Sequence, residues 1–275
     1  METRALYDLH LHTTASDGKL RPRELVRAAK SSGLRAFAIT DHDTVEGIPE
    51  AMEEAAALGI ELIPGVEVSA NFGEAPVHVL GLFIEYREPW LEKFFSEAAE
   101  RRIDRVHEMV RRLGGVGIGI DAKAVLACSS HGTVGRPHVA EVLVARGVVR
   151  TMKEAFDRYL GQDCPAYVGY EKVTLRDAVD LIRRAGGVAS LAHPVLLRDD
   201  SLIPRMVEDD LQAIEVFHKD HTPEKASEYD ALASSLGLLQ TGGSDFHRSE
   251  NGEPPRLGCP ELTEEAFARL RASAR

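Results

Sequence analysis

The sequence predicts an α/β fold, a barrel of strands and helices with one helical insertion over the C-terminal face of the strands. Apolar runs rich in β-branched and aliphatic residues alternate with helical patterns, and His, Asp or Glu residues stand at or near the end of each run. In a β/α barrel the C-terminal ends of the strands meet on one face, so residues scattered from position 10 to position 247 can converge there. The alternation stops after residue 84, and this interruption predicts the insertion.

Seven apolar runs are the predicted strands, and each one carries or precedes residues of the metal-ligand type. The runs cover residues 5–11, 35–40, 61–68, 75–84, 187–192, 213–217 and 238–243. In the same order they present His10, His12 and Asp17; Asp41 and His42; Glu67; His78; His193; His218 and His221; and Asp245 with His247. Between most of these runs the sequence has a helical pattern.

The middle of the chain, from about residue 89 to residue 163, has a mostly helical pattern. Ile103, Val106, Val110 and Leu113 recur at helical spacing, and the glycine pair at 114–115 is a helix stop. Further helical runs follow Gly-Arg-Pro-His at 135–138 and cover 152–160, and a helix at 175–185 marks the return of the strand-helix order. We therefore expect three segments: a first part of the barrel (1–88), an insertion or lid (89–170) and a second part of the barrel (171–275).

Composition limits the classes of function. The chain has 275 residues with 44% hydrophobic content, enough for one large domain, and its net charge of −11 argues against a general nucleic-acid coat. Residues 98–170 contain eleven Lys or Arg against eight Asp or Glu, a net charge of +3, so this segment is the candidate for holding an anion. No apolar run approaches the ~20 residues of a membrane helix, and the three cysteines form no metal motif, so we expect a cytoplasmic protein with reduced thiols.

The residues at the strand ends together predict a metal centre. Imidazole and carboxylate ligands suit Zn, Mn or Fe, and several carboxylates favour two or three ions and hydrolytic chemistry. His10 and His12 alternate along a strand and therefore point to the same face, and Asp245 and His247 have the same spacing. Each residue alone is more often structural, but seven such placements together favour the metal site.

Several short motifs resemble those of the PHP (polymerase and histidinol phosphatase) superfamily. They are Asp-Leu-His-Leu-His-Thr (8–13), Thr-Asp-His-Asp (40–43), Gly-Val-Glu-Val (65–68), Ala-His-Pro (192–194) and Gly-Ser-Asp-Phe-His (243–247). The middle segment, with Gly-Arg-Pro-His-Val-Ala (135–140), Ala-Phe-Asp-Arg-Tyr-Leu (155–160) and Pro-Ala-Tyr-Val (165–168), resembles the TrpH/YciV-like phosphoesterases. The resemblance implies a distorted (β/α)7 barrel and the activities of that branch: 3′-phosphate removal from nucleoside 3′,5′-bisphosphates, or trimming of short RNA from a 5′-monophosphate end.

The resemblance also implies a ligand set for three divalent ions. One ion takes His10, His12, Glu67 and Asp245; a second takes Asp17, His42 and His247; and a third takes Glu67, His78 and His193. We expect two or three ions, Mn²⁺ in the first place, with Zn²⁺, Fe²⁺ or Mg²⁺ as alternatives. Asp17, His42 and His247 are expected to act in catalysis, whereas Asp41 and Asp43 are expected to orient an imidazole.

A second group of residues is expected to bind the substrate. Arg101, Arg102 and Arg105 share one helix of the insertion, and Arg101 and Arg105 are four residues apart on one face. Arg136 and His138 open another helix, where free backbone N–H groups can also face an anion. The alternatives are a solvated basic surface and simple helix initiation.

Four further histidines lie outside the predicted ligand set. His221 is the candidate for hydrogen-bonding or protonating the leaving oxygen, and it is therefore placed with both the catalytic and the substrate-binding residues. His218 is expected either to support a metal ligand or to be structural. His107 and His131 are expected to be surface or packing residues.

These features predict a metal-dependent phosphomonoesterase acting on nucleoside 3′,5′-bisphosphates, because two arginine clusters suit a substrate with two phosphates. Alternatives are a 5′-to-3′ exoribonuclease on short 5′-phosphorylated RNA, a histidinol-phosphate phosphatase, and a non-catalytic metal-binding module. The complete ligand set argues against the non-catalytic module. The expected partner is a small nucleotide or a short oligonucleotide, with no membrane, no duplex nucleic acid and no obligate protein partner.

Overall fold

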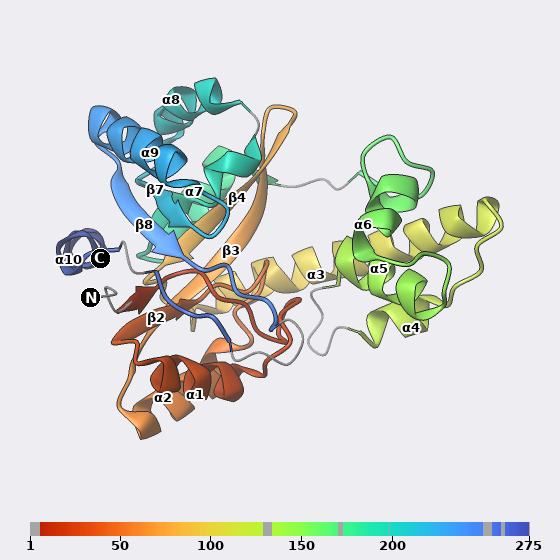
Figure 1. The fold of residues 1–275 in the computed structure, drawn as a ribbon, viewed down its shortest axis with the longest axis horizontal. Helices are drawn as coiled ribbons and strands as arrows, with labels where there is room; N and C mark the ends of the chain where they lie inside the picture. Colours follow the sequence, from red (N-terminus) through yellow and green to blue (C-terminus); the bar gives the residue numbers. More distant parts are fainter. Residues whose placement is uncertain are drawn as a thin grey trace.

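The computed structural model describes residues 6–128, 134–169, 173–197, 199–249, 255–259 and 262–274. The molecule has two lobes, a barrel that contains both ends of the described chain and a smaller helical lobe built from its middle (Figure 1). Among the described residues, no helix is both long and apolar enough to cross a membrane.

The sheet of the barrel follows the order β1-β2-β3-β4-β6-β7-β8, and the short strand β5 pairs with β3. The Leu9 N–H donates to the Gly242 carbonyl at 3.0 Å, which joins the β1 end of the sheet to the β8 end and nearly closes the barrel. This arrangement confirms the predicted fold class. The strands are β1 (Tyr7–Asp8), β2 (Ala36–Ile39), β3 (Glu61–Phe72), β4 (Ala75–Leu82), β5 (Val173–Thr174), β6 (Val188–Leu191), β7 (Ala213–His218) and β8 (Leu239–Gly243).

Strand β4 is the main distortion of the barrel, because it is antiparallel to both of its neighbours, β3 and β6. Strands β3 and β4 form a hairpin whose turn contains Gly73 at φ 58°, a left-handed conformation that glycine adopts at little cost. No crossover helix therefore separates these two strands. His78, on β4, is paired with Ser69 on β3, so it lies within a strand and not past its end.

Helices cover the outside of the barrel (Figure 1). The regular ones are α1 (Pro22–Ser32), α2 (Ile48–Leu58), α7 (Leu175–Arg184), α9 (Pro223–Leu236) and α10 (Glu264–Ser273), and a series of short turns runs through Pro194–Leu197, Asp200–Leu202, α8 (Ile203–Met206) and Val207–Asp209. Helix α7 follows the predicted pattern: Val179 and Ile182 are buried on its inner face. It ends at the residue before Ala185, as expected from the glycine pair at 186–187.

The helical lobe lies between β4 and β5 in the chain. It contains α3 (Pro89–Gly115), α4 (Ala122–Leu126), α5 (Arg136–Ala145) and α6 (Met152–Ala155), and α6 continues into a π-helical turn at Phe156–Leu160. Helix α3 belongs to two hydrophobic cores: Leu91 and Phe95 pack in the barrel, whereas Met109 and Leu113 pack in the core of the helical lobe. The insertion is thus a lobe with its own core, and the expected boundaries at 88 and 170 stay a prediction.

Candidate metal centre

Glu67, on β3, lies at the middle of the site. Its side chain is buried, and a single carboxylate contacts ring nitrogens that come from five different points of the chain. Oε2 lies 3.3 Å from His10 Nε2, 3.2 Å from His12 Nε2 and 3.1 Å from His42 Nδ1, and Oε1 lies 2.8 Å from His78 Nδ1 and 3.0 Å from His193 Nε2.

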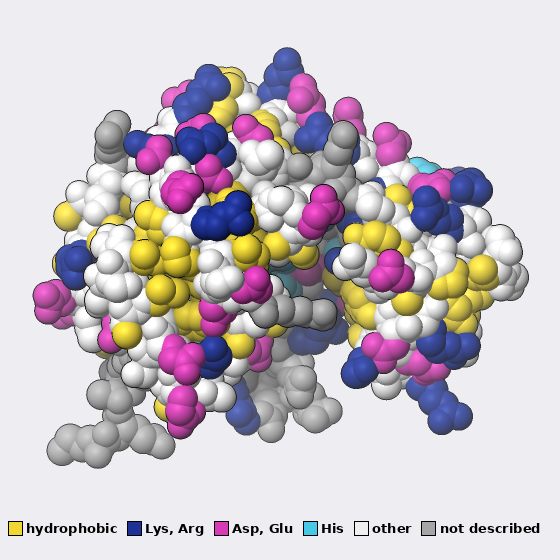
Figure 2. Space-filling view, turned by 90° about the horizontal axis from the view of Figure 1, so that it is seen from above, with side chains coloured by type: hydrophobic (Ala, Val, Ile, Leu, Met, Phe, Trp, Pro, Cys, Tyr) yellow, Lys and Arg dark blue, Asp and Glu magenta, His cyan; other side chains and the backbone are white. Residues whose placement is uncertain are grey.

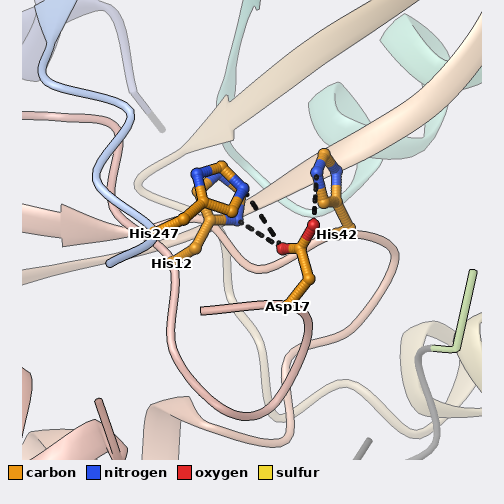
Figure 3. Close-up of side chains that lie close together, drawn as sticks. All are labelled: His12, Asp17, His42 and His247. Atoms are coloured by element: carbon orange, nitrogen blue, oxygen red, sulfur yellow. Dashed lines mark ion pairs between the residues drawn. The ribbon is translucent and has the colours of Figure 1, made fainter. Parts of the chain in front are cut away.

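Asp17 is the centre of a neighbouring cluster with His12, His42 and His247 (Figure 3). Asp17 Oδ1 is 3.2 Å from His247 Nε2, and Asp17 Oδ2 is 3.9 Å from His42 Nε2. Asp245 connects the two clusters, because its Oδ1 lies 3.3 Å from both His12 Nε2 and His247 Nδ1. The structure therefore brings all nine predicted ligands together at one face of the barrel, with Glu67 and His78 inside strands β3 and β4.

The polar atoms at the centre fit divalent ions. His10 Nε2, His12 Nε2, His42 Nδ1 and Glu67 Oε2 are buried and make no hydrogen bond within the described chain, although each nitrogen is within 3.3 Å of that oxygen. Buried polar atoms without partners are rare and costly in folded proteins. Ions would satisfy these lone pairs, and groups of three or four ligand atoms here lie within 4.8 Å of one another.

The pKa shifts agree with a site that favours bound cations. Burial opposes ionisation of Glu67, but interaction with the surrounding imidazoles, His42, His78 and His10, holds the pKa of this carboxyl well below its usual range. Burial likewise lowers the pKa of His42 to about 3, so this ring stays neutral and keeps a lone pair. For His12 burial acts in the same direction, but the nearby carboxylates of Asp245 and Glu67 outweigh it and raise the pKa to about 10. In the absence of metal, a proton on His12 thus occupies the place that an ion would take.

Glu215, on β7, supports the cluster and was not identified from the sequence. It is fully buried, its Oε1 lies 3.1 Å from His10 Nδ1, and its Oε2 accepts the His193 backbone N–H at 2.7 Å. A carboxylate that binds the far nitrogen of an imidazole fixes which nitrogen can face an ion. The available signal was a single Glu inside the otherwise apolar run Ala213–Phe217.

Asp41 and Asp43 make their hydrogen bonds to groups other than imidazoles, so the expectation that they orient an imidazole stays a prediction. Asp41 accepts hydrogen bonds from the backbone and hydroxyl of Thr13, both at 2.7 Å, and from the Ser16 hydroxyl at 2.7 Å. Asp43 accepts the backbone N–H of Ser69 at 2.7 Å and forms an ion pair with Arg102 of the insertion. The backbone after β2 turns these carboxylates away from the rings, toward a loop and toward the second lobe.

A cleft of about 150 Å³ lies between the metal cluster and the helical lobe. The hollow between the two lobes is seen from above in Figure 2. The predicted residues that line the cleft are Asp17, His42 and His78 on the barrel side and Arg102, Arg105, Arg136 and His138 on the insertion side. Ser16, Ser69 and Phe156 also line it, and the sequence did not indicate them.

On the insertion side of the cleft, polar contacts hold the arginine side chains in place. Arg102 donates to the Ser69 hydroxyl at 2.9 Å in addition to its ion pair with Asp43, and Arg105 donates to the Val168 carbonyl at 3.0 Å. The Arg136 guanidinium donates to the Leu160 carbonyl at 3.4 Å and lies 5.7 Å from the centre of the Phe156 ring. His138 is buried at the start of α5, where its Nδ1 accepts the Gly135 N–H at 3.2 Å.

A model of the PHP domain matches residues 8–159, more than half of the chain. This chain belongs to the PHP domain family. It is 37% identical over 253 residues to a 3′,5′-nucleoside bisphosphate phosphatase from Chromobacterium violaceum, covering 89% of this chain and 88% of the relative. It is 36% identical over 250 residues to the 5′-3′ exoribonuclease Rnm from Salmonella typhimurium, covering 88% and 85%. A solved structure from Bifidobacterium adolescentis, described as a candidate metal-dependent phosphoesterase, has a TM-score of 0.86 and 31% identity over 98% of this chain and 96% of that chain.

Two predicted substrate-binding residues of this PHP chain do not reach the cleft. Arg101 is exposed. The face of α3 that meets the cleft carries Arg102 and Arg105, which are three residues apart, and Arg101 lies outside this face. The His221 ring packs 4.9 Å from the Tyr229 ring, and its Nδ1 lies 2.8 Å from the Val216 carbonyl. A role of His221 in protonating the leaving oxygen therefore has no geometric support.

Of the remaining histidines, the structure describes His218 and His107. His218 is buried, and its Nε2 lies 3.5 Å from Asp245 Oδ2, so it contacts a predicted ligand. His107 is exposed on α3, as expected. His131 lies outside the described residues.

Proposed function

We propose that this chain is a metal-dependent phosphomonoesterase that removes the 3′-phosphate of nucleoside 3′,5′-bisphosphates such as pAp. The observation that carries the proposal is the cleft, because one wall contains metal-ligand residues and the other contains arginines. The relative named as a 3′,5′-nucleoside bisphosphate phosphatase supports it, since the match covers most of both chains.

The barrel wall is assigned to the reacting phosphate. Divalent ions held there would lower the pKa of a water molecule toward about 7 and would neutralise charge on phosphate oxygens. The nine ligands are proposed to hold two or three ions, with Mn²⁺ as the first choice. Asp17, His42 and His247 form the cluster nearest the cleft, and we assign the catalytic ion to them.

The insertion wall is assigned to the phosphate that is not cleaved. Arg136 is the strongest candidate, because in the described part of the chain it forms no ion pair with a carboxylate, whereas Arg102 is already paired with Asp43. Helix α5 begins at Arg136, so the positive end of its helix dipole lies at the cleft and favours an anion. Arg101 stays in the proposal only as a residue that would need another α3 side-chain conformation to reach the phosphate.

Exoribonuclease action on short 5′-phosphorylated RNA is the second candidate. It is favoured by the similarity to Rnm. The identity and coverage of this match are close to those of the match to the bisphosphate phosphatase. Both reactions need the same two elements, a hydrolytic centre and a holder for a 5′-phosphate, so one cleft can serve both. We propose that the enzyme acts without an obligate protein partner. We propose the cytoplasm as its location, because nucleotides and short RNA occur there.

The deciding experiment is an assay of the metal-loaded protein on pAp, short 5′-phosphorylated RNA and histidinol phosphate. We expect the highest kcat/KM for pAp, with inorganic phosphate and the 5′-monophosphate as products. Release of mononucleotides from RNA as the faster reaction would establish the exoribonuclease. Preference for histidinol phosphate would remove the role of the arginine wall, and bound metal without turnover on any substrate would indicate a non-catalytic module.

A further inference from the structure

His12 lies between two ligand clusters and offers one ring nitrogen to each. Its Nε2 is 3.2 Å from Glu67 Oε2 and 3.3 Å from Asp245 Oδ1, whereas its Nδ1 is 3.9 Å from Asp17 Oδ1 (Figure 3). A neutral imidazole carries one proton, so only one of its nitrogens has a lone pair for an ion. The position of that proton decides which cluster His12 can serve.

The Ser16 hydroxyl faces the nitrogen in question. Ser16 Oγ lies 3.5 Å from His12 Nδ1 and 2.7 Å from Asp41 Oδ1, so the short contact to the carboxylate identifies the acceptor of the hydroxyl hydrogen. Asp41 cannot reverse this bond while it is ionised, because a carboxylate only accepts. Both side chains are buried, with exposures of 2% for Ser16 and 1% for Asp41.

Asp41 is itself held in one orientation. The backbone N–H of Thr13 donates to Oδ1 and the Thr13 hydroxyl donates to Oδ2, both at 2.7 Å. These contacts hold the Asp41 carboxylate as an acceptor, so the hydrogen bond between Ser16 and Asp41 has one direction, from the hydroxyl to the carboxylate. The free lone pairs of the Ser16 oxygen are what remains for His12.

We propose that Asp41 and Ser16 are positioning residues that fix the tautomer of His12. Ser16 accepts the proton of His12 Nδ1, and this leaves Nε2 as the ligand of the ion shared with His10, Glu67 and Asp245. His12 then does not serve the ion held by Asp17, His42 and His247. The inference depends on the proposed metal centre but not on the substrate.

At the neighbouring His10, a buried carboxylate contacts Nδ1 directly, without a hydroxyl between them. Its Nδ1 lies 3.1 Å from Glu215 Oε1, and its Nε2 points to Glu67 Oε2 at 3.3 Å. Each histidine of the HxH pair thus has a buried carboxylate behind its Nδ1. For His10 the carboxylate makes the contact itself, and for His12 it acts through the Ser16 hydroxyl.

The first test is nitrogen NMR of the zinc-loaded protein with ¹⁵N-labelled histidine, in which a His12→Asn variant assigns the His12 signals. We expect a protonated Nδ1 and a zinc-bound Nε2 for His12. Zinc bound at Nδ1, or a proton on Nε2, would overturn the inference. This readout does not involve turnover, so it is independent of whether the proposed phosphatase activity is found.

The second test measures metal affinity of a Ser16→Ala variant by competition with a chelating dye. Loss of a supporting hydrogen bond to a ligating histidine lowers metal affinity by about 10- to 100-fold, and we expect this for one ion only. Ser16→Ala keeps both contacts between Asp41 and Thr13, and Ser235→Ala, whose hydroxyl donates to the Leu232 carbonyl on the surface, is the matched control. Wild-type affinity for every ion in Ser16→Ala would contradict the proposed role of Ser16 and Asp41 in positioning His12.

Discussion

The two walls of the cleft are built differently. On the barrel side of the cleft, the centre of the metal cluster is buried, and its side chains contact one another so densely that Glu67 alone touches five imidazoles. On the insertion side, Arg102, Arg105 and Arg136 are partly exposed and are held by polar contacts with neighbouring side chains and carbonyls. The difference indicates that the chemistry is set by a rigid cluster, whereas substrate recognition depends on a few contacts that can be changed singly.

The largest effect is expected for Glu67→Gln. The substitution keeps the size of the side chain but removes the charge that offsets repulsion between neighbouring cations, so more than one ion should be lost, together with turnover. Elemental analysis after saturation with Mn²⁺ would measure the stoichiometry. Asp17→Asn is the matched variant, because Asp17 belongs to a single cluster and its substitution should empty one site; equal losses in both variants would remove the central role of Glu67.

On the insertion wall, Arg136→Ala should lower kcat/KM for pAp by about tenfold to 150-fold, because a charge-assisted hydrogen bond contributes roughly 1.5–3 kcal/mol. A substrate with only the cleaved phosphate should be nearly unaffected. Arg111→Ala is the control from the same lobe, since the exposed Arg111 side chain pairs with Glu108 and does not line the cleft. Equal losses on both substrates would place Arg136 at the reacting phosphate or in the fold.

Two histidines of the barrel wall should give the metal-free protein opposite dependences of stability on pH. The pKa of His42 is lowered from 6.5 to about 3, so its contribution is lost as pH falls from 6.5 toward 3, where only the unfolded chain binds the proton. The pKa of His12 is raised from 6.5 to about 10, so its contribution is complete below 6.5 and is lost as pH rises to 10. Urea unfolding across pH should show that His12→Asn flattens the alkaline decline and His42→Asn weakens the acid decline; the reverse pattern would contradict the assignment.

The smallest effect is expected where the walls meet at an exposed ion pair. Glu141 of α5 lies 2.7 Å from Lys19 Nζ, in the loop that carries Asp17. Exposed pairs contribute about 0.2–1 kcal/mol, so Glu141→Gln should raise KM by less than about fivefold, and only at low salt. Glu154→Gln, which breaks a pair with Arg158 inside the insertion, should leave KM unchanged. A loss of turnover in Glu141→Gln would mean that α5 controls the metal cluster itself.

The sequence predicted the barrel because strand periodicity is a local pattern, and the resemblance to PHP motifs named nine ligand candidates that the structure brings together. The reversed strand β4 was not predicted, since a hairpin and a crossover differ mainly in the turn at Gly73. Glu215 was missed because a single acidic residue in an apolar strand has no spacing to mark it. Arg101 was predicted together with Arg105 because helical spacing indicates which residues share a face. Which face meets the cleft depends on tertiary packing, which the spacing does not contain.

The π-helical turn at Phe156–Leu160 has a consequence for how the cleft could arise. A π-helical turn is equivalent to an α-helix with one residue added, and such turns are frequent at functional sites. At the start of this turn Phe156 lines the cleft, and at its end the Leu160 carbonyl accepts the Arg136 guanidinium. One inserted residue is thus sufficient to rotate Leu160 relative to Phe156 about the helix axis. Deletion of one residue here would turn either Phe156 or the Leu160 carbonyl away from its present contact.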